Sequence, residues 1–206
     1  FENDQYKTAG AKIINKAEDI FNDAEIIVKV KEPLLNEVKM IRENQIVFTY
    51  LHLAAAKELT QGLIDSNSIC IAYETVTDGK SKLPLLAPMS AVAGRMSIQA
   101  GAHSLEKAQQ GRGLLLGGAP GVNPANVLIL GGGVVGENAA DIATGMKAKV
   151  TILDKSTQRL KALQNKFGEL IIPHLIDDID LKELVKKADV FIENFVPGTL
   201  EKWGIG

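Results

Sequence analysis

The sequence predicts an α/β fold built from two parallel-sheet domains. In both halves of the 206-residue chain, short β-branched apolar runs alternate with longer segments of helical periodicity. The densest Gly/Pro stretch, residues 111–127, separates the two halves. We therefore expect a first domain over residues 1–123, which includes a linking helix over 90–110, and a second domain over 124–206. With 46% hydrophobic residues the chain can bury a core.

The first half should contain three strands joined by helices. Residues 1–21 should form a helical segment before the first strand, because the apolar residues between positions 9 and 21 keep roughly helical spacing. Another helix should begin near residue 55. The expected strands are the apolar runs over residues 24–30, 45–50 and 68–73.

The long helix that closes the first half has recognisable ends. Ser90 precedes the apolar-periodic run and is expected to act as its N-cap, because a serine oxygen accepts a free N–H of the first turn. Gly111 and Gly113 should end the segment that this helix opens.

The second half repeats the alternation of strands and helices. Strands are expected over residues 127–130, 149–153, 170–172 and 189–195. The helices that should separate them cover residues 137–146, 157–167 and 181–187.

Composition excludes several classes of partner. The net charge is −2 and the 23 basic residues are scattered, so no basic face for nucleic acid is expected. No apolar run approaches the roughly 20 residues that cross a bilayer, so no membrane contact is expected either. The single cysteine, Cys70, is expected to be a buried apolar residue in a reducing compartment. We expect a soluble cytoplasmic protein without a metal site.

The most informative stretch is "LILGGGVVGENAADIATG". Gly131, Gly133 and Gly136 follow an apolar strand and open a helix, which is the arrangement of a dinucleotide-binding turn. The helix N-terminus would receive the pyrophosphate. Asp154 ends the next strand, where a carboxylate accepts both ribose hydroxyls and repels a 2′-phosphate. The pattern thus favours NAD over NADP and a Rossmann-like domain. A purely structural turn is the alternative, and the nearby Lys155 and Arg159 weaken the exclusion of NADP.

Several motifs resemble the alanine dehydrogenase family in order and spacing. They are "VKVKEPL", "VFTYLHLAA", "IAYETV", "LPLLAPMSAVAGRMSIQAGAHSLEKAQQGRGLLLGGAPGV" and "VLILGGGVVGENAADIATGMKAKVTILD", and the resemblance covers about residues 9–176. It implies two Rossmann-like domains and the NAD-dependent, reversible oxidative deamination of L-alanine to pyruvate and ammonia. It also implies a homo-oligomer, since family members are usually hexamers.

The resemblance assigns roles where the motifs match. Lys31 matches the lysine that holds and polarises the substrate, and His52 matches the catalytic acid/base. Independently, imidazole is suited to proton transfer near neutral pH, and Lys31 follows a strand at the edge where α/β sheets bind ligands. The residues on the cofactor side are Ser90, Gly131, Gly133, Val134, Val135, Gly136, Asp154 and Arg159.

Two departures from the family pattern shape the expectation. Family members begin earlier and continue further, so we expect a chain truncated at both ends with an incomplete second sheet. The tail "ADVFIENFVPG" resembles type III CoA-transferases instead. The alternatives are the NAD-binding subunit of a proton-translocating transhydrogenase, against which His52 argues because that subunit lacks the catalytic histidine, and an inactive NAD-binding fragment.

Overall fold

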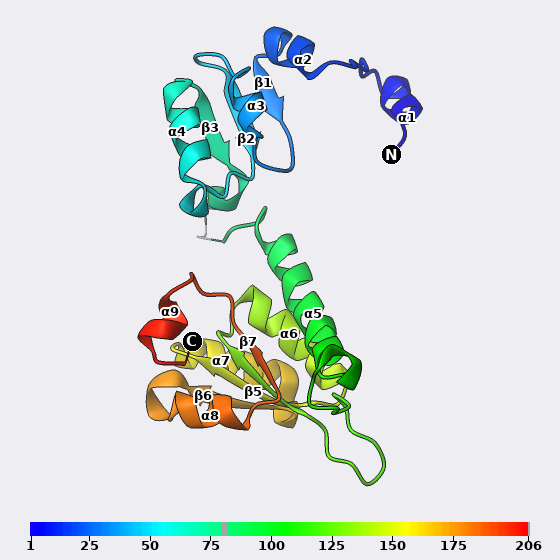
Figure 1. The fold of residues 1–206 in the computed structure, drawn as a ribbon, viewed down its shortest axis with the longest axis vertical. Helices are drawn as coiled ribbons and strands as arrows, with labels where there is room; N and C mark the ends of the chain where they lie inside the picture. Colours follow the sequence, from blue (N-terminus) through cyan, green and yellow to red (C-terminus); the bar gives the residue numbers. More distant parts are fainter. Residues whose placement is uncertain (80–81, 206) are drawn as a thin grey trace. The chain divides into compact units, whose positions relative to one another are not determined.

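The computed structural model describes residues 1–79 and 82–205 and divides into two compact units, Phe1–Leu86 and Ala87–Gly206. Figure 1 shows a small sheet with its helices in the first unit and a larger, helix-covered sheet in the second. Each unit has its own hydrophobic core, as the alternation of strands and helices predicts.

The first unit is a three-stranded parallel sheet in the order β1-β2-β3. The strands are β1 (Ile26–Val28), β2 (Ile46–Thr49) and β3 (Ile69–Ala72), and they confirm the three predicted strands. The helices are α1 (Asn3–Thr8), α2 (Ala17–Asp23), α3 (Leu35–Val38) and α4 (Lys57–Asp65). Side chains from α2, α3 and α4 pack on the sheet around the fully buried Val47.

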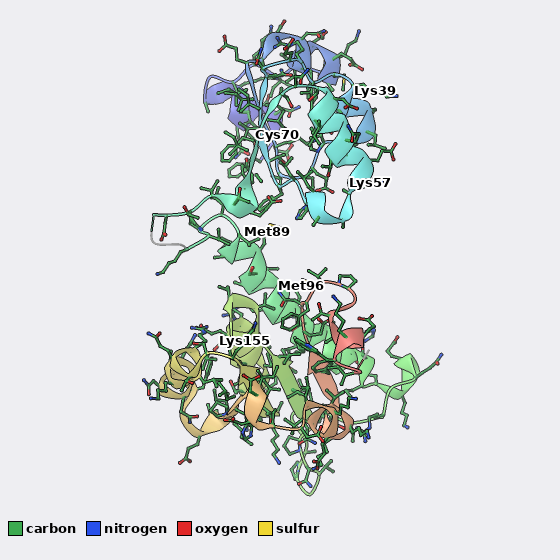
Figure 2. The ribbon with its side chains drawn as sticks, turned by 90° about the vertical axis from the view of Figure 1, so that its left-hand side faces the viewer. Lys39, Lys57, Cys70, Met89, Met96 and Lys155 are labelled. Carbon is green, nitrogen blue, oxygen red and sulfur yellow. The ribbon has the colours of Figure 1, made fainter. Side chains whose placement is uncertain are left out.

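Two expectations for this unit need correction. The continuous helical segment over residues 1–21 is wrong, because the chain forms two helices there: α1 ends at Thr8 and α2 begins at Ala17. Gly10, with a φ of +92°, takes a conformation that a right-handed helix cannot continue through. Cys70 is half-buried rather than fully buried, and it lies in β3, an edge strand of the sheet (Figure 2).

The second unit is a four-stranded parallel sheet in the order β6-β5-β4-β7. Its strands are β4 (Asn126–Leu130), β5 (Lys149–Asp154), β6 (Ile171–Leu175) and β7 (Val190–Ile192). Its helices are α5 (Ala87–Ser104), α6 (Val134–Gly145), α7 (Thr157–Phe167), α8 (Leu181–Lys187) and α9 (Thr199–Lys202). In chain order the strands lie 3-2-1-4, as in the Rossmann fold.

The two faces of this sheet are covered by different helices. Apolar residues of α5, α6 and α7 pack on one face around Ile129 and Ile152, and those of α8 pack on the other around Leu128 and Leu153. Because both faces are buried, β4 reads as a continuous apolar run. The predicted helices over 157–167 and 181–187 are confirmed by α7 and α8. The tail of the chain supplies β7 to this sheet.

Helix α5 differs from its prediction at both ends. It begins at Ala87, so Ser90 lies inside its first turn and is not the N-cap. Pro88 fits that first turn, where its missing N–H costs no helical hydrogen bond. The helix ends at Ser104, and beyond it the N–H of Gly113 donates to the carbonyl of Leu105 at 2.7 Å.

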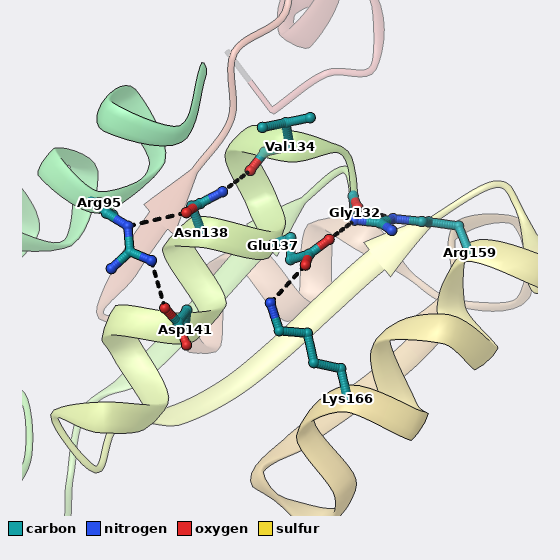
Figure 3. A network of polar contacts seen from close by, with 8 residues as sticks. All are labelled: Arg95, Gly132, Val134, Glu137, Asn138, Asp141, Arg159 and Lys166. Atoms are coloured by element: carbon teal, nitrogen blue, oxygen red, sulfur yellow. Dashed lines mark hydrogen bonds and ion pairs between the residues drawn. The ribbon is translucent and has the colours of Figure 1, made fainter. Parts of the chain in front are cut away.

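Helix α5 packs on α6 within the second unit. A Cβ on Gly94 would lie 2.2 Å from the Val135 carbonyl oxygen, so only glycine permits this approach. Arg95 donates to Asn138 at 3.1 Å and to Asp141 at 2.8 Å (Figure 3). These contacts place α5 in the unit that begins at Ala87, whereas the sequence assigned it to a domain over residues 1–123. Among the described residues, none of the helices is long and apolar enough to cross a membrane.

Candidate nucleotide-binding and acid–base sites

The glycine turn joins β4 to α6. Gly131 has a φ of +101°, which favours glycine, and a Cβ on Gly136 would lie 1.9 Å from the Gly131 carbonyl oxygen. At Gly133 the situation is the opposite, because a Cβ there would meet nothing within 4 Å. Two of the glycines are therefore needed by the turn itself, and Gly133 faces open space.

A small cavity of about 220 Å³ lies against this turn. It brings together six of the sequence-predicted cofactor residues, namely Ser90, Gly131, Gly133, Val134, Val135 and Gly136. Its other wall comes from residues 192–195, at the end of β7. The cavity thus lies between β4 and β7, where the strand order reverses and open α/β sheets bind ligands.

The N-terminus of α6 supplies backbone N–H groups to this cavity. The first helical hydrogen bond runs from the N–H of Glu137 to the Gly133 carbonyl at 2.9 Å. The N–H groups of Val134, Val135 and Gly136 precede that bond, so they lie at the open, electropositive end of the helix. Such an end binds phosphate groups.

A larger cavity of about 710 Å³ continues along the same sheet edge. Leu130, Gly131 and Phe195 line both cavities, and the larger one also contains Asp154 and Trp203. Phe195 and Trp203 meet edge to face, with ring centroids 5.3 Å apart. A largely apolar space beside a carboxylate and a phosphate-binding turn fits an adenosine group. No motif of the sequence pointed to either aromatic as a binding residue, since Phe195 lies in the predicted last strand and Trp203 beyond it.

Asp154 is fixed by the backbone around it. Its Oδ2 accepts the Gly132 N–H at 2.7 Å and its Oδ1 accepts the Ser156 N–H at 2.8 Å. Each carboxylate oxygen has a second lone pair, so both remain able to accept a ribose hydroxyl. Lys155, next in the chain, is exposed and lines the same cavity (Figure 2).

Arg159 belongs to a network that the sequence did not reveal. Its Nε donates to the Gly132 carbonyl and its Nη2 pairs with Glu137 on α6 (Figure 3). The other carboxylate oxygen of Glu137 accepts from Lys166 Nζ at 2.7 Å. The hydrogen bond from Lys166, followed by that from Arg159, holds the pKa of Glu137 below its usual value despite partial burial.

In the first unit, His52 lies on a tight turn just after β2. Its φ of 50° is left-handed, and its backbone N–H donates to Glu74 Oε1 at 2.8 Å, beside the N–H of Leu51 at 3.0 Å. Burial raises the pKa of Glu74, but the hydrogen bonds from backbone N–H groups, that of His52 first, outweigh it and lower the pKa. Glu74 therefore fixes the conformation of this turn.

The imidazole of His52 is oriented by a second carboxylate. Its Nδ1 lies 3.0 Å from Glu32 Oε2, and the side chain is 49% exposed. Because an ionised carboxylate only accepts, Nδ1 donates and Nε2 is left for another partner. A hydrogen bond from the backbone N–H of Glu32, followed by that from His52, lowers the pKa of Glu32. Glu32 directly follows Lys31 in the chain, and this position beside a predicted catalytic residue is the one sequence feature that could have pointed to it.

Lys31 lies exposed in the segment that follows β1. Its carbonyl accepts from the hydroxyl of Thr49, which is fully buried at the end of β2, at 2.8 Å. The turn after β1 is thus joined to β2. The positive charge of Lys31 also lowers the pKa of Glu32. Lys31, Glu32 and His52 therefore share one sheet edge. Within residues 1–79 and 82–205, no group of three or more His, Cys, Asp or Glu side chains could hold a metal ion.

Relatives with known names match almost the whole chain. It is 52% identical over 189 residues to the alanine dehydrogenase of Methanococcus maripaludis, covering 92% of this chain and 51% of the relative. It is 49% identical over 192 residues to that of Bacillus subtilis, covering 93% of this chain and 50% of the relative. The chain therefore spans about half the length of these relatives.

Solved structures agree at the level of the fold. An L-alanine dehydrogenase superposes with a TM-score of 0.84 at 47% identity, covering 96% of this chain and 55% of that one. A transhydrogenase from Sinorhizobium meliloti, at 22% identity and a TM-score of 0.70, shares the fold and covers 96% of this chain and 57% of that one.

Family models divide the chain in the same order as its two units. The N-terminal domain model described as alanine dehydrogenase/PNT matches residues 1–93, and the C-terminal domain model matches residues 97–200. Together with the glycine turn and the relatives above, these matches lead to one conclusion. The chain belongs to the alanine dehydrogenase/PNT family.

Proposed function

We propose that this chain carries out the chemistry of an NAD-dependent alanine dehydrogenase, the reversible oxidative deamination of L-alanine to pyruvate and ammonia. The observation that carries the proposal is the 46% to 52% identity to proteins named alanine dehydrogenase across both family domains. The acid–base pair at the edge of the first sheet supports it.

NAD is the proposed cofactor, and the residues of the glycine turn fit it. The N–H groups of Val134, Val135 and Gly136 would hold the pyrophosphate, and Asp154 would accept the adenosine ribose hydroxyls. Ser90 lines the same cavity, and Arg159 completes the proposed set by supporting the turn through the Gly132 carbonyl. When bound, NAD accepts the hydride that leaves the Cα of L-alanine.

The side chains of the first unit handle the substrate. Lys31 would pair with the substrate carboxylate and polarise the carbonyl as negative charge develops on its oxygen. Loss of hydride from alanine leaves iminopyruvate, to which water adds. His52 Nε2 would take a proton from that water as it adds and pass it to the nitrogen, then take the hydroxyl proton as the C–N bond breaks and ammonia leaves, while Glu32 holds the ring from its Nδ1 side.

The proposal extends to the assembly and the compartment. We propose a homo-oligomer that works in the cytoplasm, as the family resemblance implies. The single cysteine supports a reducing compartment, because it leaves no internal disulfide.

Turnover tests the proposal directly. L-Alanine-dependent formation of NADH is measured with the chain itself and with a chimera in which the chain replaces the matching 189 residues of the Methanococcus maripaludis relative. The chimera should turn over alanine in preference to other amino acids. A chimera that folds and binds NAD but does not oxidise alanine would overturn the proposal.

Asp154 tests the cofactor assignment. Titration of the chain should give a lower Kd for NAD than for NADP, because the carboxylate repels a 2′-phosphate. Asp154→Ala should narrow that difference. Equal affinity of the unchanged chain for NAD and NADP would remove Asp154 from the ribose site.

A further inference from the structure

Glu137 lies between two cations on the flank of the glycine turn. Its carboxylate accepts from Arg159 on one oxygen and from Lys166 on the other, and only 26% of its side chain is exposed. Figure 3 shows these contacts bridging the first turn of α6 and helix α7. The fingerprint of three glycines and one acidic residue does not include Glu137.

The contacts of Glu137 reach the proposed ribose site through a single peptide unit. The Gly132 N–H donates to Asp154, and the Gly132 carbonyl accepts from Arg159 Nε. A Cβ built on Gly132 would lie 3.2 Å from Asp154 Oδ2 and 3.4 Å from Arg159 Cγ. The stem of Arg159 and the Asp154 carboxylate therefore meet at the same peptide unit, while the guanidinium of Arg159 is turned toward Glu137 on α6.

An arginine at this position has a second use in dinucleotide-binding folds, since an Arg near the ribose accommodates the 2′-phosphate of NADP. In this chain Nη2 of Arg159 pairs with the Glu137 carboxylate, and its Nε donates to the Gly132 carbonyl. Asp154 would repel a 2′-phosphate. Arg159 would attract one only if its guanidinium were released from Glu137.

We propose that Glu137 is a specificity-determining residue that favours NAD over NADP by holding Arg159 away from the ribose edge and neutralising its charge. The inference rests on the proposed function only in that a dinucleotide binds this turn. Glu137 acts through Arg159 and is a positioning residue, with Lys166 holding its other oxygen. Asp154 then repels a 2′-phosphate without an opposing charge from Arg159.

Dinucleotide affinity tests the proposal in the full 206-residue chain. The Kd values of NAD and NADP are measured by calorimetry and by the fluorescence of Trp203, the single tryptophan, which lines the larger cavity. Glu137→Gln keeps the shape of the side chain and removes its charge. It should lower the Kd of NADP by about tenfold, the scale of one hydrogen bond to a charged group, with the NAD affinity nearly unchanged.

Two further variants serve as controls. Asp141→Asn removes the same charge one turn further along α6, where the carboxylate pairs with Arg95 instead, and it should leave both affinities unchanged. Glu137→Asp keeps the charge and should retain the preference for NAD. Thermal melting of each variant confirms that it folds.

The outcomes separate the two proposals. If Glu137→Gln changes the NAD-to-NADP ratio no more than Asp141→Asn does, or weakens both dinucleotides equally, Glu137 is only structural and the inference is overturned. If the unchanged chain binds neither dinucleotide, the proposed cofactor site itself is wrong.

Discussion

At the scale of single residues, the proposed acid–base site depends on how His52 is held. One carboxylate, Glu74, accepts its backbone N–H, and another, Glu32, accepts from its ring. The ring of Tyr50 stacks beside it, with centroids 6.0 Å apart and planes 16° apart. A base oriented by a third group is the usual arrangement for proton transfer in enzymes.

Substitution of His52 tests its role in the chimera described above. His52→Ala should lower kcat by roughly 10²- to 10⁴-fold, because it removes a general acid/base. The affinity for NAD should change little, since His52 is absent from both cavities of the second unit. His103→Ala is the matched control, because His103 is also an exposed histidine paired with a glutamate, Glu106 at 3.4 Å. Equal activity of the two variants would make His52 a packing residue.

Lys31 should behave differently from His52. Lys31→Ala should raise the KM for pyruvate and lower kcat together, because the cation serves both the bound substrate and the charge that develops on its oxygen. The loss in Lys31→Ala/His52→Ala should be smaller than the sum of the two single losses, since both residues act on one reacting centre. Steady-state kinetics in the direction of reductive amination measure both effects. Additive losses would mean that the two side chains act independently.

At the scale of the element, the β4–α6 turn combines two kinds of glycine. Gly131 and Gly136 allow the chain to turn, since a Cβ on Gly136 would strike the carbonyl of Gly131. Gly133 leaves open space at the helix N-terminus. Of these three glycines, Gly131 and Gly136 therefore serve folding and, by our proposal, Gly133 allows the ligand to approach.

Alanine substitutions separate these two purposes. Gly136→Ala should destabilise the chain by about 1–3 kcal/mol, the usual cost of overpacking, because the clash is with backbone. Gly133→Ala should leave the free energy of unfolding within about 0.5 kcal/mol of the parent while weakening NAD binding, because the added methyl group takes up part of the space that Gly133 lines. Urea unfolding and calorimetric titration measure the two quantities. Unchanged NAD affinity in Gly133→Ala would show that the pyrophosphate does not approach this position.

At the scale of the whole molecule, stabilising carboxylates occur in both units. Glu32, Glu37 and Glu74 in the first unit and Glu137 in the second all have a pKa below the ordinary value of 4.5. For Glu37, burial raises the pKa, but the hydrogen bonds from Lys29 and from the Leu34 backbone outweigh it. The folded chain therefore binds protons at these groups less readily than the unfolded chain does.

This difference predicts how stability depends on pH. The stabilisation from these carboxylates is fully present above pH 4.5, and it is lost as the pH falls through their lower folded values. Urea midpoints should be nearly constant from about pH 7 to pH 5 and fall as the pH drops below about 4.5. Glu137→Gln should flatten the part of this fall that belongs to the second unit. A midpoint that rises on acidification would contradict the assignment.

The sequence by itself determined the elements and the turn. Alternating strands and helices, the bounds of α7 and α8 and the position of the glycine turn follow from local periodicity and from glycines close together in the chain. The prediction of one long opening helix was wrong for an equally local reason, because Gly10 takes a positive φ despite the helical spacing of the apolar residues around it. Local periodicity carries no information about which residues of neighbouring elements touch.

Tertiary structure decided what each charged group does. Arg159 meets Glu137 across 22 positions of sequence, and His52 meets Glu32 across 20, so neither pair leaves a local pattern. The same holds for α5, whose place in the second unit depends on the fit of Gly94 against Val135 of α6 rather than on its own composition. Periodicity records which face of an element is apolar, whereas the partner of a polar side chain depends on which elements the fold brings together.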